Sequence, residues 1–454
     1  MFRHTIGVRV FIVFCCLLTA QTIQGAEPRT ELISIDRNGK PCGGYSGNIS
    51  GNGRYVAFTS SCNTIVAGDT NNRTDIFVRD RKTGITSRVS VNSDGSQANK
   101  DSGWPAISSN GRYVAFTSDA SNLVAGDTNN RADIFRHDRQ TGVTIRVSVD
   151  SAGNQSNQTS YSRTDISADG RYVVFSSRAS NLVAGDTNDT SDVFLHDCQT
   201  GETVRVSVDS SGNEGNGKSE GASISSDGRY IAFASTATNL VADDTNNTSD
   251  IFVHDRVTGE TTRVNLSSTG EESNAYDLGA RISGNGRFVV FPSHASNLVD
   301  NDTNGILDIF RHDRETGMTE RISVNKWGEQ GQGPDLPHNL PVFISSKGRY
   351  IAFESFAANL VPDDPNGSGR DMFIKDMVNG NVGRVDFGFH ATLKELTGIS
   401  ADGNFLVFYS NSDTLVPDDT NGVRDVFVYG PLLDSESSNQ LFIPAIPTFL
   451  LSSP

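Results

Sequence analysis

The sequence has little of what marks a nucleic-acid-binding or membrane-spanning protein. Acidic residues outnumber basic ones by 54 to 38, so there is no basic stripe to displace counterions from phosphates. No long helical pattern of apolar residues occurs, and the apolar runs near the two ends are too short for a good bilayer span. We therefore expect no nucleic-acid partner and no integral membrane span in the mature chain.

The sequence motifs of common hydrolases are also missing. There is no nucleophile elbow, because the one G-x-S-x-G match, at residues 217–221, is not followed by a helical pattern. There is also no H-E-x-x-H zinc motif, and none of the S-x-D-x-G-x-T-W boxes of sialidase-type propellers. We therefore expect no catalysis. The alternative is a secreted hydrolase or lyase that uses Asp residues of its loops as acid and base.

Residues 1–26 read as a secretory signal. Arg3 and Arg9 give a positive n-region, residues 10–20 are apolar, and small residues near Gly25 and Ala26 offer a cleavage site. This predicts a secreted or periplasmic protein, with an uncleaved anchor as the alternative. Residues 431–454, rich in serine and proline, are predicted to be a tail packed on the fold or a sorting remnant.

Cysteine is scarce, with five in the whole chain. Two of them lie in the signal, which leaves Cys42, Cys62 and Cys198. Cys42 and Cys62 lie in loops expected on the same rim, so a disulfide between them is predicted for an oxidising compartment. Cys198 is expected to be a lone thiol.

One unit of text recurs seven times between residues 30 and 429. Its second copy reads ISSNGRYVAFTS from Ile107, then a D-T-N loop from Asp127, then ADIFRHDRQTGVTIRVSV from Ala132. An arginine that opens the Tyr/Phe strand sets the register, with spacings of 55 to 62 residues; its positions are Arg54, Arg112, Arg171, Arg229, Arg287 and Arg349, with Asn404 in the seventh copy. A tandem unit of this length is one supersecondary element copied along the chain.

Each copy is predicted to form four short antiparallel strands. Alternating apolar residues fill 112–118, 133–138 and 144–149, and Asn110-Gly111 and Thr141-Gly142 mark tight turns between strands. Four-stranded sheets repeated in this way are the blades of a β-propeller. We therefore predict an all-β, seven-bladed propeller over residues 27–430.

The two ends of the array are complementary halves of one blade. Residues 30–36 match the fourth strand of a copy, whereas the seventh copy stops after its third strand, at Asp425 to Tyr429. Pairing these ends would close the ring and remove the open edges that invite aggregation. We expect such a closed ring to be a monomer.

The repeated pattern resembles a known family. S-x-[DN]-G-R-[YF]-[VI]-[AV]-F-x-S followed by D-[IV]-F-x-x-D, as in residues 167–177 and 192–197, is similar to the WD-repeat-like propeller repeat of TolB-type proteins. The resemblance implies a propeller and a binding scaffold. TolB itself has six blades and an added N-terminal domain, so the resemblance does not carry its partners over to a seven-bladed chain.

The sharpest local motif is a D-x-N-x-x-x-D loop between the second and third strands. Its spacing matches positions 3, 5 and 9 of calcium loops, and the fifth copy adds a carboxylate at position 1, so calcium would be held by Asp300, Asp302, Asn304 and Asp308. The other reading is that Asx turns shape the loop, and we prefer it because it needs no metal. Calcium is the one cofactor that the sequence suggests.

The loops between the fourth strand and the next copy carry a second repeated text, G-x-[QE]-x-[NQ]. We expect these amides to brace the neighbouring D-T-N loop, although they could also read sugar hydroxyls. Both loop types are long and share one rim, which is where ligands should bind. Exposed aromatics around this text are the candidate contacts to a protein or glycan ligand: Trp104, Tyr161, Tyr276 and Trp327.

Overall fold

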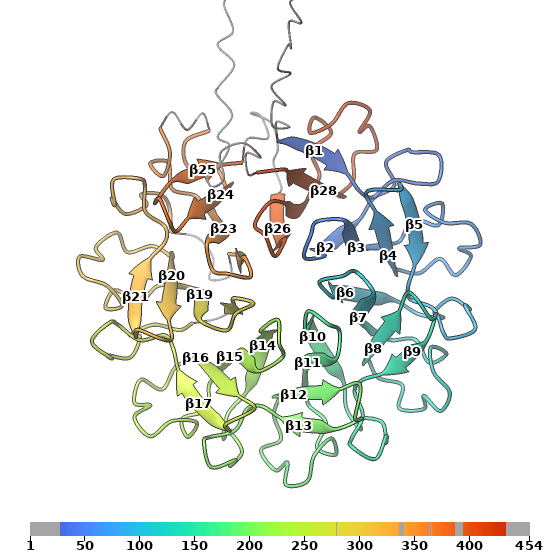
Figure 1. Ribbon diagram of the computed structural model, residues 1–454, viewed down its shortest axis with the longest axis horizontal. Helices are drawn as coiled ribbons and strands as arrows, with labels where there is room; N and C mark the ends of the chain where they lie inside the picture. Colours follow the sequence, from blue (N-terminus) through green and yellow to red (C-terminus); the bar gives the residue numbers. More distant parts are fainter. Residues whose placement is uncertain are drawn as a thin grey trace, which may run out of the picture.

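The computed structural model describes residues 28–277, 279–335, 340–362, 364, 366–385 and 394–432. These residues form seven four-stranded antiparallel sheets arranged as blades around a central axis (Figure 1). The predicted seven-bladed propeller is confirmed. Within the described residues no helix is long and apolar enough to cross a membrane.

The blades, numbered 1 to 7 from residue 45, share one order of strands. The innermost strands are β2 (Tyr45–Ile49), β6 (Ser102–Ile107), β10 (Ser160–Ile166), β14 (Ser219–Ile224), β18 (Arg281–Ile282), β22 (Val342–Ile344) and β26 (Lys394–Ile399). The second strands are β3 (Tyr55–Ser60), β7 (Tyr113–Ser118), β11 (Tyr172–Ser177), β15 (Tyr230–Ser235), β19 (Phe288–Ser293), β23 (Tyr350–Ser355) and β27 (Leu406–Ser410). The third strands are β4 (Asp75–Asp80), β8 (Asp133–Asp138), β12 (Asp192–Asp197), β16 (Asp250–Asp255), β20 (Asp308–Asp313), β24 (Asp371–Asp376) and β28 (Asp425–Gly430). The outermost strands are β5 (Ile85–Arg88), β9 (Thr144–Arg146), β13 (Thr203–Arg205), β17 (Glu260–Arg263), β21 (Met318–Arg321), β25 (Val382–Arg384) and β1 (Arg29–Leu32).

Ring closure occurs as the sequence predicted. β1 pairs antiparallel with β28, in register from Arg29 opposite Gly430 to Leu32 opposite Phe427. The N-terminal strand is shorter than expected, ending at Leu32, because Ile35 turns back to bridge Pro41. Blade 7 is thus built from both ends of the described chain, which lie side by side in Figure 1.

A pair of phenylalanines forms the centre of every blade. Phe116 and Phe135 lie opposite each other on β7 and β8, with their ring centroids 5.9 Å apart and no exposed surface. The same pairing recurs in the other six blades, between Phe58 and Phe77, Phe175 and Phe194, Phe233 and Phe252, Phe291 and Phe310, Phe353 and Phe373, and Phe408 and Phe427. Cross-strand aromatic pairs stabilise a sheet beyond the area that they bury.

The arginine that set the repeat register has a structural role. Arg112 donates from Nε and Nη2 to the two carboxylate oxygens of Asp138, at 2.8 and 2.6 Å, which ties the second strand to the end of the third. The guanidinium holds the pKa of Asp138 well below its usual range. The same fork joins Arg54, Arg171, Arg229, Arg287 and Arg349 to their own aspartates.

Two turn glycines, Gly111 and Gly142, are expected to differ in how well they tolerate substitution by alanine. Gly111 has a φ of 73°, and a Cβ there would lie 2.1 Å from Cδ2 of Tyr55 in the preceding blade. Gly142 has a similar φ of 76° but no atom within 4 Å of such a Cβ. We expect Gly111→Ala to destabilise the fold by more than about 1 kcal/mol, and clearly more than Gly142→Ala, in thermal unfolding. Equal losses would show that backbone strain alone matters at both turns.

The cysteines behave as predicted. Cys42 and Cys62 form a disulfide with their Cα atoms 5.8 Å apart, and Cys198 is free. Burial raises the pKa of the Cys198 thiol to about 11, so it carries little thiolate at neutral pH. The predicted signal, residues 1–26, lies outside the described residues, as does the predicted tail apart from residues 431 and 432.

Candidate functional site

The D-x-N-x-x-x-D loops are held by an arginine that sequence reasoning missed. In blade 5, Nη1 of Arg321 lies 2.9 Å from Asp302 and 3.2 Å from Asp308, so a guanidinium sits between the two carboxylates. The outermost strand supplies the same arginine in six blades, opposite the central phenylalanine of the third strand: Arg88, Arg146, Arg205, Arg263, Arg321 and Arg384. Its signal was the recurring R-[VI] pair, which is followed by S-V in blades 1, 2, 3 and 5.

The middle asparagine forms the predicted Asx turn in the loops of blades 1 to 5 and 7. Asn304 accepts a hydrogen bond from the Ile306 amide at 3.2 Å and donates from Nδ2 to Asp308 at 2.9 Å. Asp308 also accepts from the hydroxyl of Ser323. The calcium site at Asp300, Asp302, Asn304 and Asp308 stays a prediction, although Arg321 already neutralises two of its carboxylates and Asp300 is exposed.

The glutamines and glutamates of the next loop brace the D-T-N loop, as expected. Gln97 accepts from the Thr70 amide at 3.2 Å and donates to the Thr70 hydroxyl at 2.7 Å. In blade 3 a glutamate takes this place, and Glu214 lies within 4.8 Å of Asp186 and Asp192. Arg205 is 2.5 Å from Glu214, so this acidic group also has a guanidinium beside it.

The repeated histidines of the third strand are structural. His137 is buried and its Nδ1 lies 2.9 Å from the hydroxyl of Thr144 on the neighbouring strand. Burial lowers its pKa to about 4, so the ring is neutral at physiological pH. His196, His254 and His312 repeat the arrangement.

The symmetry of the ring breaks at the central channel. A cavity of 230 Å³ there is lined by the innermost strands of all seven blades. Most of the fold repeats its sequence, but one position of the innermost strand differs from blade to blade: Asn48, Ala106, Asp165, Ser223, Arg281, Phe343 and Gly398. Trp104, Arg163 and Glu395 also line the cavity. A single asymmetric site in a symmetric ring is where ligand-specific chemistry can be placed.

Several of the innermost strands have a residue with a positive φ near their start, where the chain enters the channel. Ser46 and Trp104 have φ values of 50° and 48°, and Gly221 and Gly279 occupy the matching position in blades 4 and 5 with 71° and 74°. The pairing of β6 with β7 shifts its register between Gly103 and Ala106, which marks the bulge. A tryptophan rarely adopts positive φ, and such strain is concentrated at functional sites.

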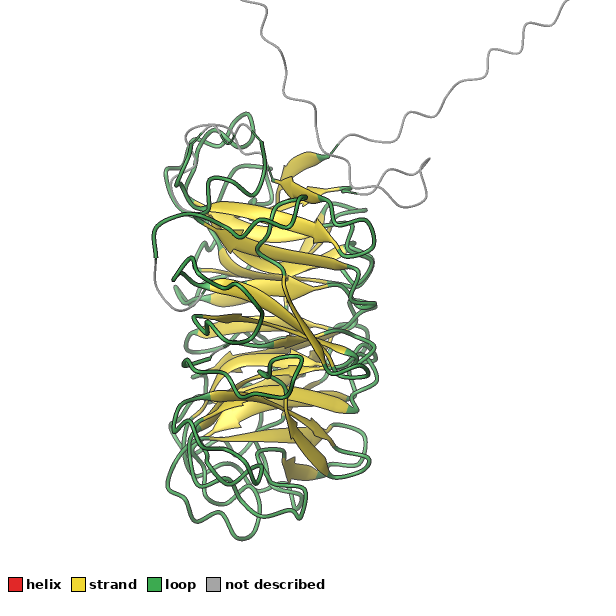
Figure 2. Cartoon of the chain, turned by 90° about the vertical axis from the view of Figure 1, so that its left-hand side faces the viewer, coloured by secondary structure: helices red, strands yellow, loops and turns green. Residues whose placement is uncertain are grey.

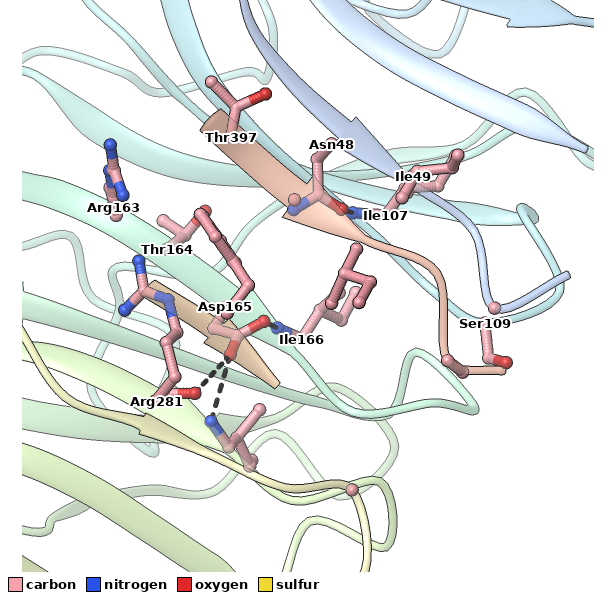
Figure 3. A pocket seen from close by; sticks show the side chains of 18 of the residues that line it. Asn48, Ile49, Ile107, Ser109, Arg163, Thr164, Asp165, Ile166, Arg281 and Thr397 are labelled. Atoms are coloured by element: carbon pink, nitrogen blue, oxygen red, sulfur yellow. Dashed lines mark hydrogen bonds between the residues drawn. The ribbon is translucent and has the colours of Figure 1, made fainter. Parts of the chain in front are cut away.

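Asp165 is fixed in one orientation inside the cavity. Its carboxylate accepts from the amides of Ile166 at 2.9 Å and Ile224 at 3.0 Å, and from the hydroxyl of Ser223 at 3.2 Å. Burial raises its pKa, while these donors and the charge of Arg281 oppose the rise. Figure 3 shows the guanidinium groups of Arg163 and Arg281 on the same side of this carboxylate.

The two channel arginines are held differently. Arg163 is exposed and lies 3.7 Å from Glu395 of blade 7, and Glu395 also accepts from the hydroxyl of Tyr409. Arg281 is partly buried, stacks over the ring of Phe343 at 5.3 Å, and donates to the Ala280 carbonyl at 3.1 Å. Among the ion pairs of the described residues, none includes Arg281.

The four predicted aromatic contacts do not form one site. Trp104 lines the channel and is half exposed. Tyr161 and Tyr276 both lie close enough to Lys218, at the start of β14, to influence its charge. Trp327 is exposed in a hairpin between Val324 and Gln330, and equivalent hairpins pack on the outermost strand of the next blade, so it lies at the periphery.

Sequence reasoning missed the charged channel residues Arg163, Asp165, Arg281 and Glu395. These residues lie next to sequence that is nearly the same in every copy of the repeat. The available signal was therefore that they differ from their counterparts in the other copies. In blade 3 the register of β10 and β11 shifts between Tyr161 and Asp165, and this irregularity leaves no clear mark in the sequence.

Solved structures share the fold at low sequence identity. An oligogalacturonate lyase from Vibrio parahaemolyticus is 11% identical, with a TM-score of 0.53 over 90% of this chain and 98% of its own. An oligogalacturonate lyase in complex with manganese is 12% identical, with a TM-score of 0.52 over the same shares. TolB from Acinetobacter baumannii is 15% identical, with a TM-score of 0.38 over 68% of this chain.

The chain spans 61% of the length of that TolB structure. No family model and no curated protein matches the sequence. The structural likenesses therefore establish the β-propeller fold alone.

Proposed function

We propose that this protein is a secreted or periplasmic, non-catalytic propeller that binds an acidic glycan where its long-loop rim meets the central channel. The observation that carries the proposal is Arg281, a partly buried guanidinium in the channel with no ion-pair partner among the described residues. Its pKa is lowered to about 10 by burial and by the charge of Arg163, so it remains protonated at neutral pH. Asp165 acts on this guanidinium through its charge but makes no contact at ion-pair distance, and a desolvated cation held in this way is stabilised by an anionic ligand that binds it directly.

Arg163 offers a second binding group. Its distance of 3.7 Å to Glu395 is long for an ion pair, and its side chain is exposed, so the pair contributes little by itself. A carboxylate that enters the channel can bind Arg163 through two parallel hydrogen bonds, which is the stronger arrangement.

The aromatic residues favour a glycan over a peptide. The half-exposed Trp104 presents a flat apolar face at the channel, as suits the face of a sugar ring. Lys218 is paired with Glu220 at 2.8 Å, so the rim near it offers mainly the two rings of Tyr161 and Tyr276. A sugar oligomer that carries a carboxylate on each ring could contact both the channel at Trp104 and the rim near Tyr161 and Tyr276.

The structural neighbours with the same overall shape are named for such a ligand, since oligogalacturonate is an acidic sugar oligomer. That likeness concerns the fold, and the choice of ligand here depends on Arg281 and Arg163. The Cys42–Cys62 disulfide supports an oxidising compartment, in agreement with the predicted signal.

Calorimetric titration with oligogalacturonate tests the proposal, with a neutral galactan oligomer and a polyglutamate peptide as comparison ligands. We expect binding of the uronate alone, weakened at least tenfold by Arg281→Met, because one charged hydrogen-bonded partner is lost. Arg178→Met, at an exposed arginine of blade 3, is the matched control and should bind as the parent does.

Two results would contradict the proposal. If the protein binds no uronate oligomer, the ligand is not an acidic glycan of this class. If Arg281→Met binds the uronate as tightly as the parent does, the site does not include Arg281. Binding of polyglutamate alone would favour a protein ligand at the same cations.

A lyase is the second candidate, and Asp165 is the observation that favours it. A carboxylate with a raised pKa beside a guanidinium is an arrangement that can remove a proton next to an uronate carboxylate. Ultraviolet absorbance of an unsaturated product would reveal this activity, and Asp165→Asn should then abolish it. Our proposal expects no such absorbance.

A further inference from the structure

Blade 7 lacks the arginine that neutralises the loop in the other six blades. Its outermost strand is β1, and the residue of β1 opposite the central phenylalanine, Phe427, is Leu32. The same position holds Arg88 opposite Phe77 in blade 1 and Arg321 opposite Phe310 in blade 5. The loop of Asp419, Asn421 and Asp425 therefore receives no guanidinium from its own blade.

The brace from the following loop is missing as well. In blade 1 the residue that bridges Val91 is Gln97, which holds the Thr70 backbone and hydroxyl. In blade 7 the corresponding bridge joins Ile35 to Pro41. Proline has no side-chain donor or acceptor, so blade 7 lacks both of the polar partners that the structure shows in blades 1 to 5.

The carboxylates of this loop are nevertheless buried. Asp425 has no exposed surface, and its oxygens accept from the Ser34 hydroxyl at 2.5 Å and from Asn421 Nδ2 at 2.7 Å. Asp419 is 4% exposed, and its buried Oδ1 has no hydrogen-bond partner. Burial and the charge of Asp425 raise the pKa of Asp419 to about 6.

Blade 1 indicates what the unpartnered oxygen lacks. The matching atom, Oδ1 of Asp69, lies 3.1 Å from Nη1 of Arg88. Among the ion pairs of the described residues none includes Asp419, so this carboxylate has no counterpart of Arg88 beside it. A buried carboxylate oxygen left without any partner costs free energy, which a bound cation would recover.

We propose that blade 7 binds a calcium ion at this place, through the carboxylates of Asp419 and Asp425 and the carbonyl oxygen of Asp418. The carbonyl is included because its counterparts accept from the arginine: Arg263 donates to the Asp243 carbonyl at 2.8 Å and Arg205 to the Gly185 carbonyl at 3.1 Å. An all-oxygen set that mixes carboxylates with a backbone carbonyl suits calcium, which accepts flexible geometry and completes its shell with water.

The site would join the two ends of the described chain. Asp425 lies on β28 and is hydrogen-bonded to Ser34, which follows β1, and to the Gly43 amide at 3.1 Å. A cation on Asp425 and Asp419 therefore stabilises the blade on which ring closure depends. In the other blades a covalently attached guanidinium has that role, whereas blade 7 would depend on calcium supplied from outside.

Calorimetric titration of the chelator-treated full chain with calcium chloride tests this inference. We expect one calcium per chain and a melting temperature that rises with calcium, because the ion binds only the folded state. Leu32→Arg should abolish binding and raise the melting temperature measured in chelator, since it restores the guanidinium. Asp419→Asn should weaken binding at least tenfold without that gain.

Asp302→Asn in blade 5 is the control and separates this site from the one predicted at Asp300, Asp302, Asn304 and Asp308. Loss of calcium binding in Asp302→Asn, with retention in Asp419→Asn, would overturn the inference in favour of blade 5. Absence of calcium binding by the parent chain at millimolar concentration, or unchanged affinity in both blade 7 variants, would overturn it outright.

Discussion

Deletion of residues 29–36 is expected to convert the protein from a monomer into aggregates. The segment contains all of β1, and its removal leaves β28 as an unpaired edge over its whole length. It also removes Ile33, which is fully buried in the core between blades 7 and 1, and the Ser34 hydroxyl that binds Asp425. Size-exclusion chromatography and thermal unfolding measure the effect.

A synthetic peptide of residues 28–44 provides the control. Added in excess, it should pair with β28 and restore part of the monomer, because strand addition satisfies an exposed edge. A deletion variant that stays monomeric with an unchanged melting temperature would contradict closure through β1.

Arg205→Leu is expected to be among the most damaging single substitutions of a loop arginine, together with Arg263→Leu, because each removes the guanidinium beside three carboxylates. Asp186, Asp192 and Glu214 lie within 4.8 Å of one another, and Arg205 is the guanidinium beside all three. Removal of a buried partner leaves uncompensated charge and costs about 3–5 kcal/mol. Chemical denaturation should show this loss, and millimolar calcium should recover part of it by occupying the vacated place.

The exposed Arg178 of the same blade is the matched control, and Arg178→Leu should change stability by less than about 0.5 kcal/mol. Equal stability of the two variants would show that Arg205 does not neutralise the loop. If calcium does not recover any of the stability that Arg205→Leu loses, the blade 3 carboxylates do not bind calcium.

The fold was predictable because each copy carries its own turn and strand signals. Asn110-Gly111 placed a turn, and the structure shows why glycine is needed there, since Tyr55 of the preceding blade covers it. Residues 30–36 revealed the split blade because they repeat the text of a fourth strand. Even the Cys42–Cys62 disulfide followed from placing two loops on one rim.

The candidate site was less predictable, since it depends on contacts between positions distant in the sequence. The carboxylates of the D-T-N loop were compared with calcium ligands, but Arg321 follows Asp308 by a whole hairpin and only strand register brings them together. Trp104 and Trp327 are both exposed aromatics near repeated loop sequence. The structure was needed to show that Trp104 lies at the channel and Trp327 at the periphery. Arg281 could be placed in the channel only once the innermost strands were known.

Ligand binding at the channel is the central claim, and the fluorescence of Trp104 tests it most directly. The chain has two tryptophans, and Trp327 lies at the periphery, so Trp327→Phe leaves Trp104 as the only reporter. Titration of this variant with oligogalacturonate should shift the emission of Trp104 with the same midpoint as calorimetric binding, and Arg281→Met should move both midpoints together. Heat of binding with no change in the emission of Trp104 would contradict a ligand site at the channel.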